Sequence, residues 1–238
     1  ARLGLTVGLS NVVQTFHDLG VERKLPAYPS IVLGAFEMSP FKVAQMYQTI
    51  ATSGFQTPLK AIRAVTTAKG ELLSSYGYAV KKTIKTEPIY LLQTIMQKVV
   101  KLGTARFLNT QFDSSLNLAG KTGTSDSQRD SWFAGFSGNY LGVVWLGLDN
   151  NGPTKLTGGT GALKVWTDFI KRIPQYSLSM VKPSQVEYYW FDGLTGKRTD
   201  EHCRGAQVLP VWGEAKHIAY QPCQSGFSTL GGWLKSWF

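Results

Sequence analysis

Three short strand-like runs between residues 116 and 147 constrain the fold of this chain more than any other feature. The first run, L-N-L-A-G, leads directly into K-T-G-T; the second is S-W-F-A-G-F over 131–136, and the third is Y-L-G-V-V-W-L-G over 140–147. Aromatic and β-branched residues favour strands, and the turns between these runs are short and polar. The pattern therefore predicts an antiparallel meander.

The K-T-G-T segment carries a chemically informative alternation. Side chains alternate between the two faces of a strand, so Thr122 and Thr124 project together, and both hydroxyls can hydrogen-bond one carboxylate. Gly123 has no Cβ, which lets a ligand backbone approach the strand edge. Lys121 adds a fixed cation. A Lys-Thr-Gly tripeptide alone usually marks only a strand end, so a functional role can be inferred only from the motifs around it.

Helical periodicity is found on both sides of the predicted meander. One predicted helix packs an apolar face back on the sheet, formed by Ala162, Val165, Trp166 and Phe169. Two more lie upstream: the first has Val12, Val13 and Phe16 on one face and ends near Gly20, and the second covers residues 90–100 and ends before Gly103. The sequence thus predicts a sheet covered by helices.

Four further motifs accompany K-T-G-T in the chain: D-S-W-F-A-G at 130–135, W-L-G-L-D-N at 145–150, L-G-A at 33–35 with M-S-P at 38–40, and V-V-x-x-G-T-A at 99–105. With the helix that follows the meander, they resemble the transpeptidase domain of bifunctional class A penicillin-binding proteins. The resemblance covers residues 1–180. It extends through V-L-P-V-W at 208–212 into a tail that is most like the type 1b subgroup.

This resemblance implies an α/β (α+β) fold of the β-lactamase/transpeptidase-like class, with an antiparallel sheet flanked by helices. We expect residues 1–182 to form the C-terminal portion of the penicillin-binding transpeptidase domain and residues 183–238 a small C-terminal tail region. The N-terminal part of the domain is then missing from these residues. In the family that part carries S-x-N and S-x-x-K, with a glycosyltransferase domain and a membrane anchor before it.

The resemblance also implies an activity, D,D-transpeptidation. A serine attacks the D-Ala-D-Ala amide of a peptidoglycan stem peptide, D-alanine leaves, and the acyl group passes to an amine; β-lactams acylate the same serine. The implied catalytic residues are Lys121, which polarises the serine network, and Thr124, whose backbone N–H contributes to the oxyanion hole. The implied substrate-binding residues are Thr122, Gly123 and Thr124. Neither a cofactor nor a metal is implied.

Literal matches to both absent motifs occur in the chain. Residues 39–42 spell S-P-F-K, but Ser39 is a preferred N-cap and Pro40 suits the first helical position, so we interpret this match as a helix start. The S-x-N matches at 115–117 and 137–139 are interpreted as a loop entering a strand and as a tight turn. A complete active site inside these residues is therefore not expected.

Composition and charge limit the other functional classes. The 238 residues are 43% hydrophobic, which suffices for one good-sized globular core, and no apolar run approaches the ~18 to 20 residues of a membrane span. The formal charge of +10 suggests an anionic partner. The basic residues are scattered in short pairs without a nucleotide-stacking motif, so nucleic-acid binding is not predicted.

Cys203 and Cys223 are the only cysteines in the sequence. In a protein exported to an oxidising compartment such a pair is interpreted as a disulfide, and this is our prediction. Two free, buried thiols are the alternative that a cytosolic protein would favour. His202 and His217 lie nearby, but the spacings match no zinc pattern, and no metal site is predicted.

Location and partners follow from the resemblance alone. It places the parent protein at the periplasmic face of the bacterial inner membrane, with stem peptides, β-lactams and the upstream segment of the same protein as partners. Cell-wall regulatory proteins are compatible with it. The alternative function is a non-catalytic fragment or a cell-wall binding module, and upstream S-x-x-K and S-x-N motifs would discriminate the two. Residues 231–238 are expected to form either a short docking helix or a partner or membrane contact.

Overall fold

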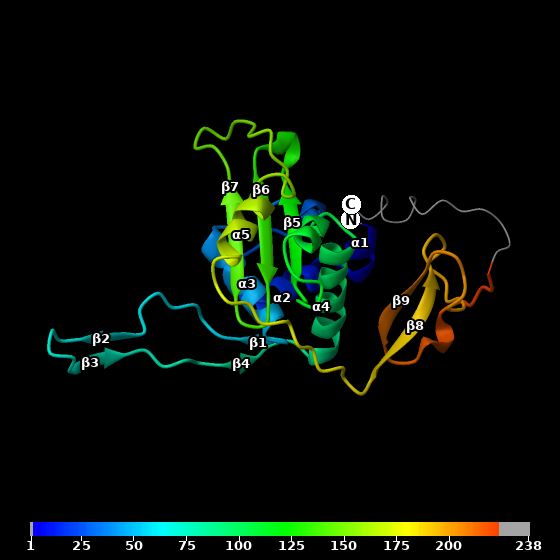
Figure 1. Cartoon of the computed structure of the whole chain (residues 1–238), viewed down its shortest axis with the longest axis horizontal. Helices are drawn as coiled ribbons and strands as arrows, with labels where there is room; N and C mark the ends of the chain where they lie inside the picture. The colour runs from blue at the N-terminus through cyan, green and yellow to red at the C-terminus, as the bar shows by residue number, and fades with distance from the viewer. Residues whose placement is uncertain (1, 224–238) are drawn as a thin grey trace.

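A three-stranded antiparallel sheet forms the centre of the computed structural model, which describes residues 2–223. Strands β5 (Ala119–Thr124), β6 (Ser131–Phe136) and β7 (Leu141–Leu146) lie in the order β5-β6-β7, each next to its neighbour along the chain (Figure 1). The predicted meander is confirmed. The antiparallel sheet with flanking helices is the predicted fold class.

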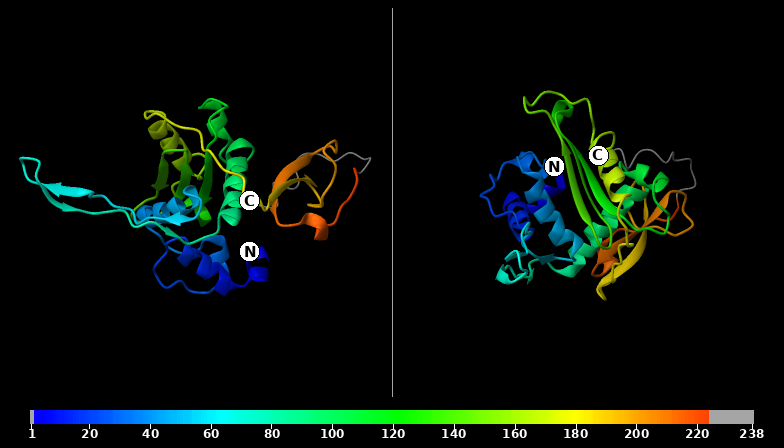
Figure 2. Two further views of the ribbon diagram at one scale, coloured as in Figure 1. Left: turned by 90° about the horizontal axis from the view of Figure 1, so that it is seen from below. Right: turned by 60° about the vertical axis from the view of Figure 1, so that its left-hand side comes forward.

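Helices cover both faces of the sheet. One face packs against α3 (Pro40–Ala51), and α5 (Ala162–Ile170) covers the other (Figure 2). α2 (Leu9–Asp18) packs outside α3, in a separate core cluster that includes Met46. α4 (Thr86–Lys101) runs beside β5 and contributes side chains to the cores on both faces. The helix predicted over 90–100 is therefore present but begins earlier, at Thr86. α2 ends just before Gly20, and the positive φ of Gly20, 101°, is a conformation that favours glycine.

The core under α5 is built around two aromatic rings. Phe133 and Trp166 are buried and meet edge to face with 5.2 Å between ring centroids. Gly142 makes room for this contact, because a Cβ there would lie 2.6 Å from Nε1 of Trp166. The helix and the sheet therefore approach each other at a position that only glycine permits.

The predicted apolar face of α5 is wrong at two positions. Val165 and Phe169 are 46% and 60% exposed, whereas Leu163, Trp166 and Ile170 are buried. The helical spacing was identified correctly, but apolar residues cover more of this helix than one face, and packing against Phe133 selects the stripe that contains Leu163 and Ile170.

An extended arm leaves the body between α3 and α4 (Figure 1). At its base β1 (Phe55–Gln56) pairs with β4 (Lys81–Lys82), and further out β2 (Ala64–Thr66) pairs with β3 (Leu72–Ser75). Nearly all residues of β2 and β3 are exposed. This hairpin was not predicted from the sequence, because neither strand has a buried face that would impose an apolar alternation.

The shorter elements complete the part of the chain that the structure describes. They are α1 (Arg2–Val7), η1 (Pro29–Leu33), η2 (Arg106–Thr110), η3 (Asp126–Gln128) and η4 (Ala215–His217). Within residues 2–223, no helix combines the length and the apolar character that crossing a bilayer requires.

The C-terminal region contains a two-stranded sheet of its own. β8 (Val186–Asp192) pairs antiparallel with β9 (Ala206–Trp212), and the hydroxyl groups of Tyr188 and Tyr90 lie 2.6 Å apart, which links β8 to α4. The division of the chain at residues 182 and 183 stays a prediction. The expectation for residues 231–238 lies outside the described residues.

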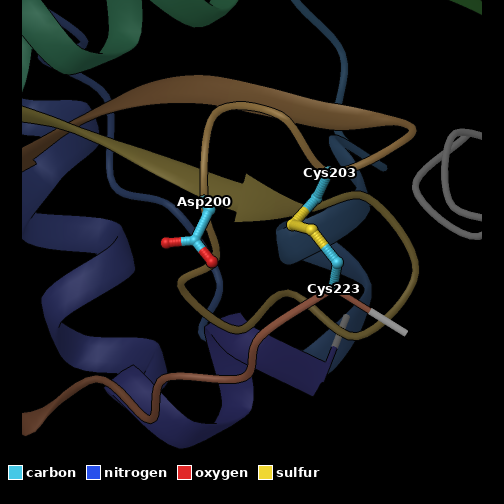
Figure 3. A group of neighbouring side chains, drawn as sticks. All are labelled: Asp200, Cys203 and Cys223. Carbon is cyan, nitrogen blue, oxygen red and sulfur yellow. A yellow bond between two sulfur atoms is a disulfide. The ribbon is translucent and has the colours of Figure 1, made fainter. Parts of the chain in front are cut away.

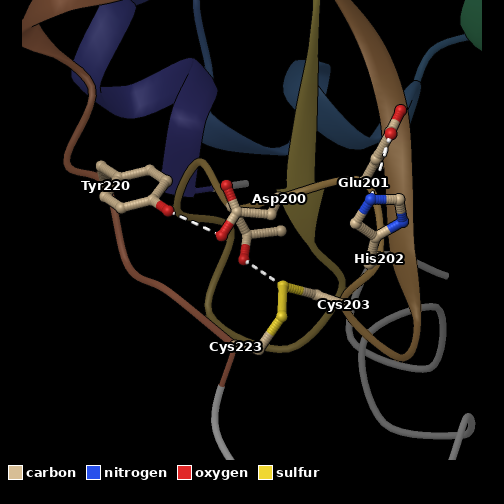
Figure 4. The surroundings of a disulfide bond; sticks show 7 residues. Asp200, Glu201, His202, Cys203, Tyr220 and Cys223 are labelled. Carbon is tan, nitrogen blue, oxygen red and sulfur yellow. Dashed lines mark hydrogen bonds and ion pairs between the residues drawn. A yellow bond between two sulfur atoms is a disulfide. The ribbon is translucent and has the colours of Figure 1, made fainter.

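A disulfide joins Cys203 to Cys223, with an S–S distance of 2.05 Å (Figure 3). Around it, Thr199 Oγ1 lies 3.0 Å from the Cys203 sulfur, and the Tyr220 hydroxyl donates to Asp200 (Figure 4). Asp200 is close to both sulfur atoms, but a disulfide offers no thiolate to a metal ion. The bond therefore connects the loop before β9 to the segment after η4.

Removing this disulfide should loosen the β8–β9 sheet. In a Cys203→Ser/Cys223→Ser variant, the unfolded ensemble of the 20-residue loop gains entropy, so the free energy of opening β8 and β9 should fall by about 3 kcal/mol. Hydrogen exchange of the β8–β9 amides measures this loss. The β5–β7 amides are the internal control, and equal protection of β8–β9 in both proteins would contradict the prediction.

Candidate functional site

The K-T-G-T residues occupy the last four positions of β5, at the edge of the central sheet. Thr124 lies opposite Ser131, and one step further the N–H of Ser125 donates to the carbonyl of Asp130 at 3.2 Å. Ser125 and Asp130 thus form a hydrogen-bonded pair. Because hydrogen-bonded and non-hydrogen-bonded pairs alternate along an antiparallel ladder, Thr124 and Thr122 belong to non-hydrogen-bonded pairs. The backbone N–H and C=O groups of Thr122 and Thr124 therefore point away from β6, toward the outer edge of β5.

Lys121 brings a positive charge to this edge. Its Nζ donates to the carbonyl oxygen of Thr122 at 2.8 Å, so the ammonium group lies beside the outward-facing backbone. Burial lowers the pKa of Lys121 below its usual value, because the protein surroundings solvate the charged form less well than water does. The side chain is thus a partly desolvated cation at the strand edge.

Both threonine hydroxyls of the segment have a protein partner. Thr122 Oγ1 lies 2.6 Å from Oγ1 of Thr104, and Thr124 Oγ1 accepts a hydrogen bond from the N–H of Gly158 at 2.9 Å. Residues two apart on a strand share a face, so these hydroxyls project together. The edge therefore combines two hydroxyls, an ammonium group and outward-facing backbone groups, which is chemistry suited to a carboxylate and an adjacent amide.

Gly158 reaches Thr124 only because it lacks a side chain. A Cβ at this position would lie 2.6 Å from the carbonyl oxygen of Trp132 and 2.7 Å from that of Gly123. Gly123 itself packs closely, since a Cβ there would lie 3.1 Å from Cβ of Trp132. The glycine of K-T-G thus relieves crowding within the sheet as well as leaving the strand edge open.

The loop that carries Gly158 is anchored to the start of β6. The hydroxyl of Ser131, which is fully buried, donates to the carbonyl of Thr157 at 2.7 Å and accepts from the N–H of Ala162 at 2.9 Å. A buried hydroxyl that both donates and accepts fixes the groups on its two sides. The loop and the first turn of α5 are therefore held against the sheet.

The D-S-W-F motif has a structural role beside the site. Trp132 and Trp145 are cross-strand neighbours whose ring centroids lie 6.1 Å apart. Asp130 accepts a hydrogen bond from Nε1 of Trp145 at 2.8 Å. The carboxylate and the aromatic pair thus tie together the ends of β6 and β7 next to K-T-G-T.

Two residues of this arrangement, Thr104 and Gly158, were not predicted from the sequence. Thr104 belongs to V-V-x-x-G-T-A, a motif that was recognised but given no role at the site. Gly158 lies in a glycine-rich stretch before α5, where only the close approach to β5 and β6 reveals why glycine is needed. The family motif was the available signal for Thr104.

The S-x-x-K match at residues 39–42 begins a helix. Ser39 is the N-cap of α3, and its hydroxyl accepts a hydrogen bond from the backbone N–H of Lys42 at 3.4 Å. The Lys42 ammonium lies 3.8 Å from Glu22. The helix-start interpretation is confirmed, and the Ser39 hydroxyl is engaged with backbone.

The two S-x-N matches also lie in turns. Ser115 follows Asp113, whose carboxylate accepts its backbone N–H at 2.8 Å. Ser137 donates to Asn139 Oδ1 at 3.0 Å, and its hydroxyl accepts from the N–H of Tyr140 in the turn between β6 and β7. Both matches therefore have local turn partners, as predicted.

A family model of the penicillin binding protein transpeptidase domain matches residues 21–160 of this chain. The match includes the whole central sheet and the K-T-G-T edge, and it extends over more than half of the chain. The chain belongs to the penicillin-binding protein transpeptidase family.

Relatives of the type 1B group resemble the chain over most of its length. Penicillin-binding protein 1B of Vibrio cholerae is 38% identical over 99% of this chain and 30% of its own length. The protein of the same name from Escherichia coli is 36% identical over 89% of this chain and 25% of its own length. The predicted resemblance to type 1b is confirmed, and the chain spans less than a third of these relatives.

Solved structures support the fold. Penicillin-binding protein 1A from Haemophilus influenzae matches with a TM-score of 0.76 at 18% identity, over 92% of this chain and 38% of that chain. PonA1 from Mycobacterium tuberculosis, in complex with penicillin V, matches with a TM-score of 0.60 at 19% identity, over 73% of this chain and 52% of that chain. Both likenesses concern the fold alone.

Gly158→Ala should destabilise the protein. The added methyl group would collide with backbone atoms of Trp132 and Gly123, which cannot move as a flexible side chain can. We expect the free energy of unfolding to fall by about 1 to 3 kcal/mol. Thermal denaturation measures this. Gly77→Ala is the matched control because its Cβ meets nothing within 4 Å; equal melting temperatures for the two variants would contradict the prediction.

Lys121 should make stability depend on pH in the alkaline range. The unfolded chain has an ordinary lysine pKa of about 10.4, and the folded chain a lower one. Between these two values the unfolded state binds more protons, so the free energy of unfolding rises with pH. Urea denaturation across this window should show a steeper rise for the wild-type chain than for Lys121→Met. Parallel pH profiles would refute the assignment.

Proposed function

We propose that this chain carries the substrate-docking edge of a peptidoglycan D,D-transpeptidase, and that the nucleophilic serine lies in another segment of the same, longer polypeptide. The proposal rests chiefly on the outer edge of β5, where Lys121 supplies a cation and Thr122 and Thr124 supply two hydroxyls and outward-facing backbone groups. Membership of the transpeptidase family supports it.

The edge matches the end of a stem peptide that terminates in D-Ala-D-Ala. The terminal carboxylate accepts hydrogen bonds from the hydroxyls of Thr122 and Thr124, and Lys121 balances its charge. The peptide backbone lies along β5 as an added strand, which uses the outward-facing backbone groups. The Thr124 N–H then donates to the oxyanion that forms on the attacked carbonyl, an interaction that typically contributes ~3 kcal/mol in such sites.

The reaction proceeds in two acyl transfers. The serine oxygen attacks the carbonyl between the two D-alanines, the C–N bond breaks, and the D-alanine nitrogen takes up the proton released from the serine. An amine from a second stem peptide then attacks the ester and restores the serine; water in place of the amine gives carboxypeptidase activity. Lys121 provides positive charge to this proton transfer, while its lowered pKa reflects its burial beside the strand edge.

A serine outside this chain is favoured by two observations. Ser39, Ser115 and Ser137, which lie in S-x-x-K or S-x-N matches, are in helix-cap or turn structures. The relatives are more than three times as long as this chain, so a parent polypeptide has room for the nucleophile. We place the parent at the periplasmic face of the inner membrane and expect it to carry a peptidoglycan glycosyltransferase as well.

Mass spectrometry of the intact protein after incubation with benzylpenicillin tests this proposal. This chain alone should gain no adduct, and the parent polypeptide should gain one, which peptide mapping places outside these 238 residues. An adduct on the chain alone that disappears in Ser39→Ala would make Ser39 the nucleophile. A parent that forms no adduct would favour the alternative, a non-catalytic cell-wall binding module.

Substitution of Lys121 tests the role of the edge in the parent. Lys121→Met removes the cation but keeps most of the apolar stem. We expect the acylation rate constant with benzylpenicillin to fall by at least about tenfold, because hydrogen bonds to charged groups are worth ~1.5 to 3 kcal/mol. Lys164→Met, at an exposed position of α5, is the matched control. Equal rates for both variants would exclude Lys121 from the site.

A further inference from the structure

Thr104 occupies a fixed position beside the docking edge. The turn that carries it is bound to the end of α4, since the N–H groups of Gly103 and Ala105 both donate to the carbonyl of Val99, at 3.0 and 3.2 Å. Ala105 is fully buried. The Thr104 side chain itself is exposed and contacts Thr122. Its hydroxyl is therefore held at the outer edge of β5 by a rigid support.

The hydrogen bonds at Thr124 determine where its proton goes. A threonine hydroxyl has one proton to donate and can accept two hydrogen bonds. The partner of Thr124 is the N–H of Gly158, which can only donate. Thr124 is therefore the acceptor in this bond, and its own proton is not used there. The proton is available to a ligand at the strand edge.

At Thr122 the direction of the hydrogen bond is not fixed by chemistry, because Thr104 and Thr122 can each donate to the other across 2.6 Å. If Thr122 donates to Thr104, its single proton is used inside the protein. If Thr104 donates, Thr122 keeps its proton for a ligand, as Thr124 does. A carboxylate can only accept hydrogen bonds, so it is bound by both threonines only in the second arrangement.

We propose that Thr104 is a positioning residue that donates its hydroxyl proton to Thr122, so that Thr122 and Thr124 both present donors to the substrate carboxylate. This inference rests on the proposed function of the edge and adds a specificity element to it. Donation to Thr122 also polarises its O–H group and strengthens the bond that it makes. Thr104 does not touch the reacting atoms and acts through Thr122.

The two supports of the threonine pair are themselves connected. A Cβ at Gly159 would lie 3.3 Å from the carbonyl oxygen of Thr104, so the loop before α5 packs against the turn after α4. Gly158 supplies one donor from this loop, and Thr104 supplies the other from the turn. Both threonines of the docking edge thus receive a hydrogen bond from a neighbouring, fixed segment.

The test compares a carboxylate ligand with its neutral analogue in the parent polypeptide. Acylation rate constants are measured for benzylpenicillin and for its methyl ester, and their ratio gives the selectivity for the carboxylate. Thr104→Val keeps the shape but removes the hydroxyl that orients and polarises Thr122. The Thr122 proton stays available in this variant, so the ratio should fall by about threefold, less than the value of a whole hydrogen bond. Thr104→Ser restores a donor and should recover most of the ratio.

The outcomes separate a positioning role from a structural one. Equal losses with both penicillins in Thr104→Val, or no recovery in Thr104→Ser, would overturn the inference. Thr104→Ala repeats the test without the second methyl group of valine, in case that group disturbs the turn. Thr66→Val, an exposed threonine of β2, is the matched control and should leave the ratio unchanged.

Thr122→Val distinguishes this inference from the proposed function. If Thr122→Val leaves the ratio of the two rate constants unchanged, the docking role of the strand edge fails. If Thr122→Val lowers the ratio and Thr104→Val does not, the edge binds the carboxylate without help from Thr104, and only the positioning inference fails. A double variant Thr104→Val/Thr122→Val should lose no more than Thr122→Val alone, because Thr104 acts through Thr122.

Discussion

The hydrogen-bonded ladder between β5 and β6 determines what the rest of the site can do. It places Thr124 opposite Ser131 and directs the backbone groups of Thr122 and Thr124 outward. A shift of one residue would exchange the two faces of β5 and turn the Lys121 side chain toward α5. Ser131 reinforces the register, since its buried hydroxyl binds both Thr157 and Ala162. The sheet thereby fixes the orientation of every group at its edge.

Close backbone approach supports this ladder from outside. Gly142 admits the ring of Trp166, which packs α5 on the sheet, and Gly158 brings a backbone N–H to Thr124. Thr104 reaches Thr122 from a turn that is bound to α4. The docking edge is therefore assembled from separate parts of the chain, each attached to a helix or to the sheet, which keeps its donors in place before a ligand arrives. Such preorganisation reduces the entropy lost on binding.

The sequence predicted the elements whose residue types and spacing carry a local signal. The meander was identified from aromatic and β-branched runs between short polar turns, and α2, α4 and α5 were identified as helical segments. The arm of β2 and β3 was missed because both strands are almost wholly exposed. The buried stripe of α5 was misplaced because the exposed residues Val165 and Phe169 are as apolar as the residues of this helix that pack on the sheet. For the cysteines the sequence left two states open, and the fold brings Cys203 and Cys223 within bonding distance.

K-T-G-T, its family and its place on a strand were determined by sequence alone, because these depend on residue type and local spacing. The tertiary structure decided which groups complete the site. Thr104 and Gly158 are distant from β5 along the chain and meet it only because α4 ends beside β5 and the loop before α5 crosses it. Hydrogen bonds act over about 3 Å in space and are independent of separation in sequence, so residue spacing along the chain does not show that Thr104 and Gly158 contact β5.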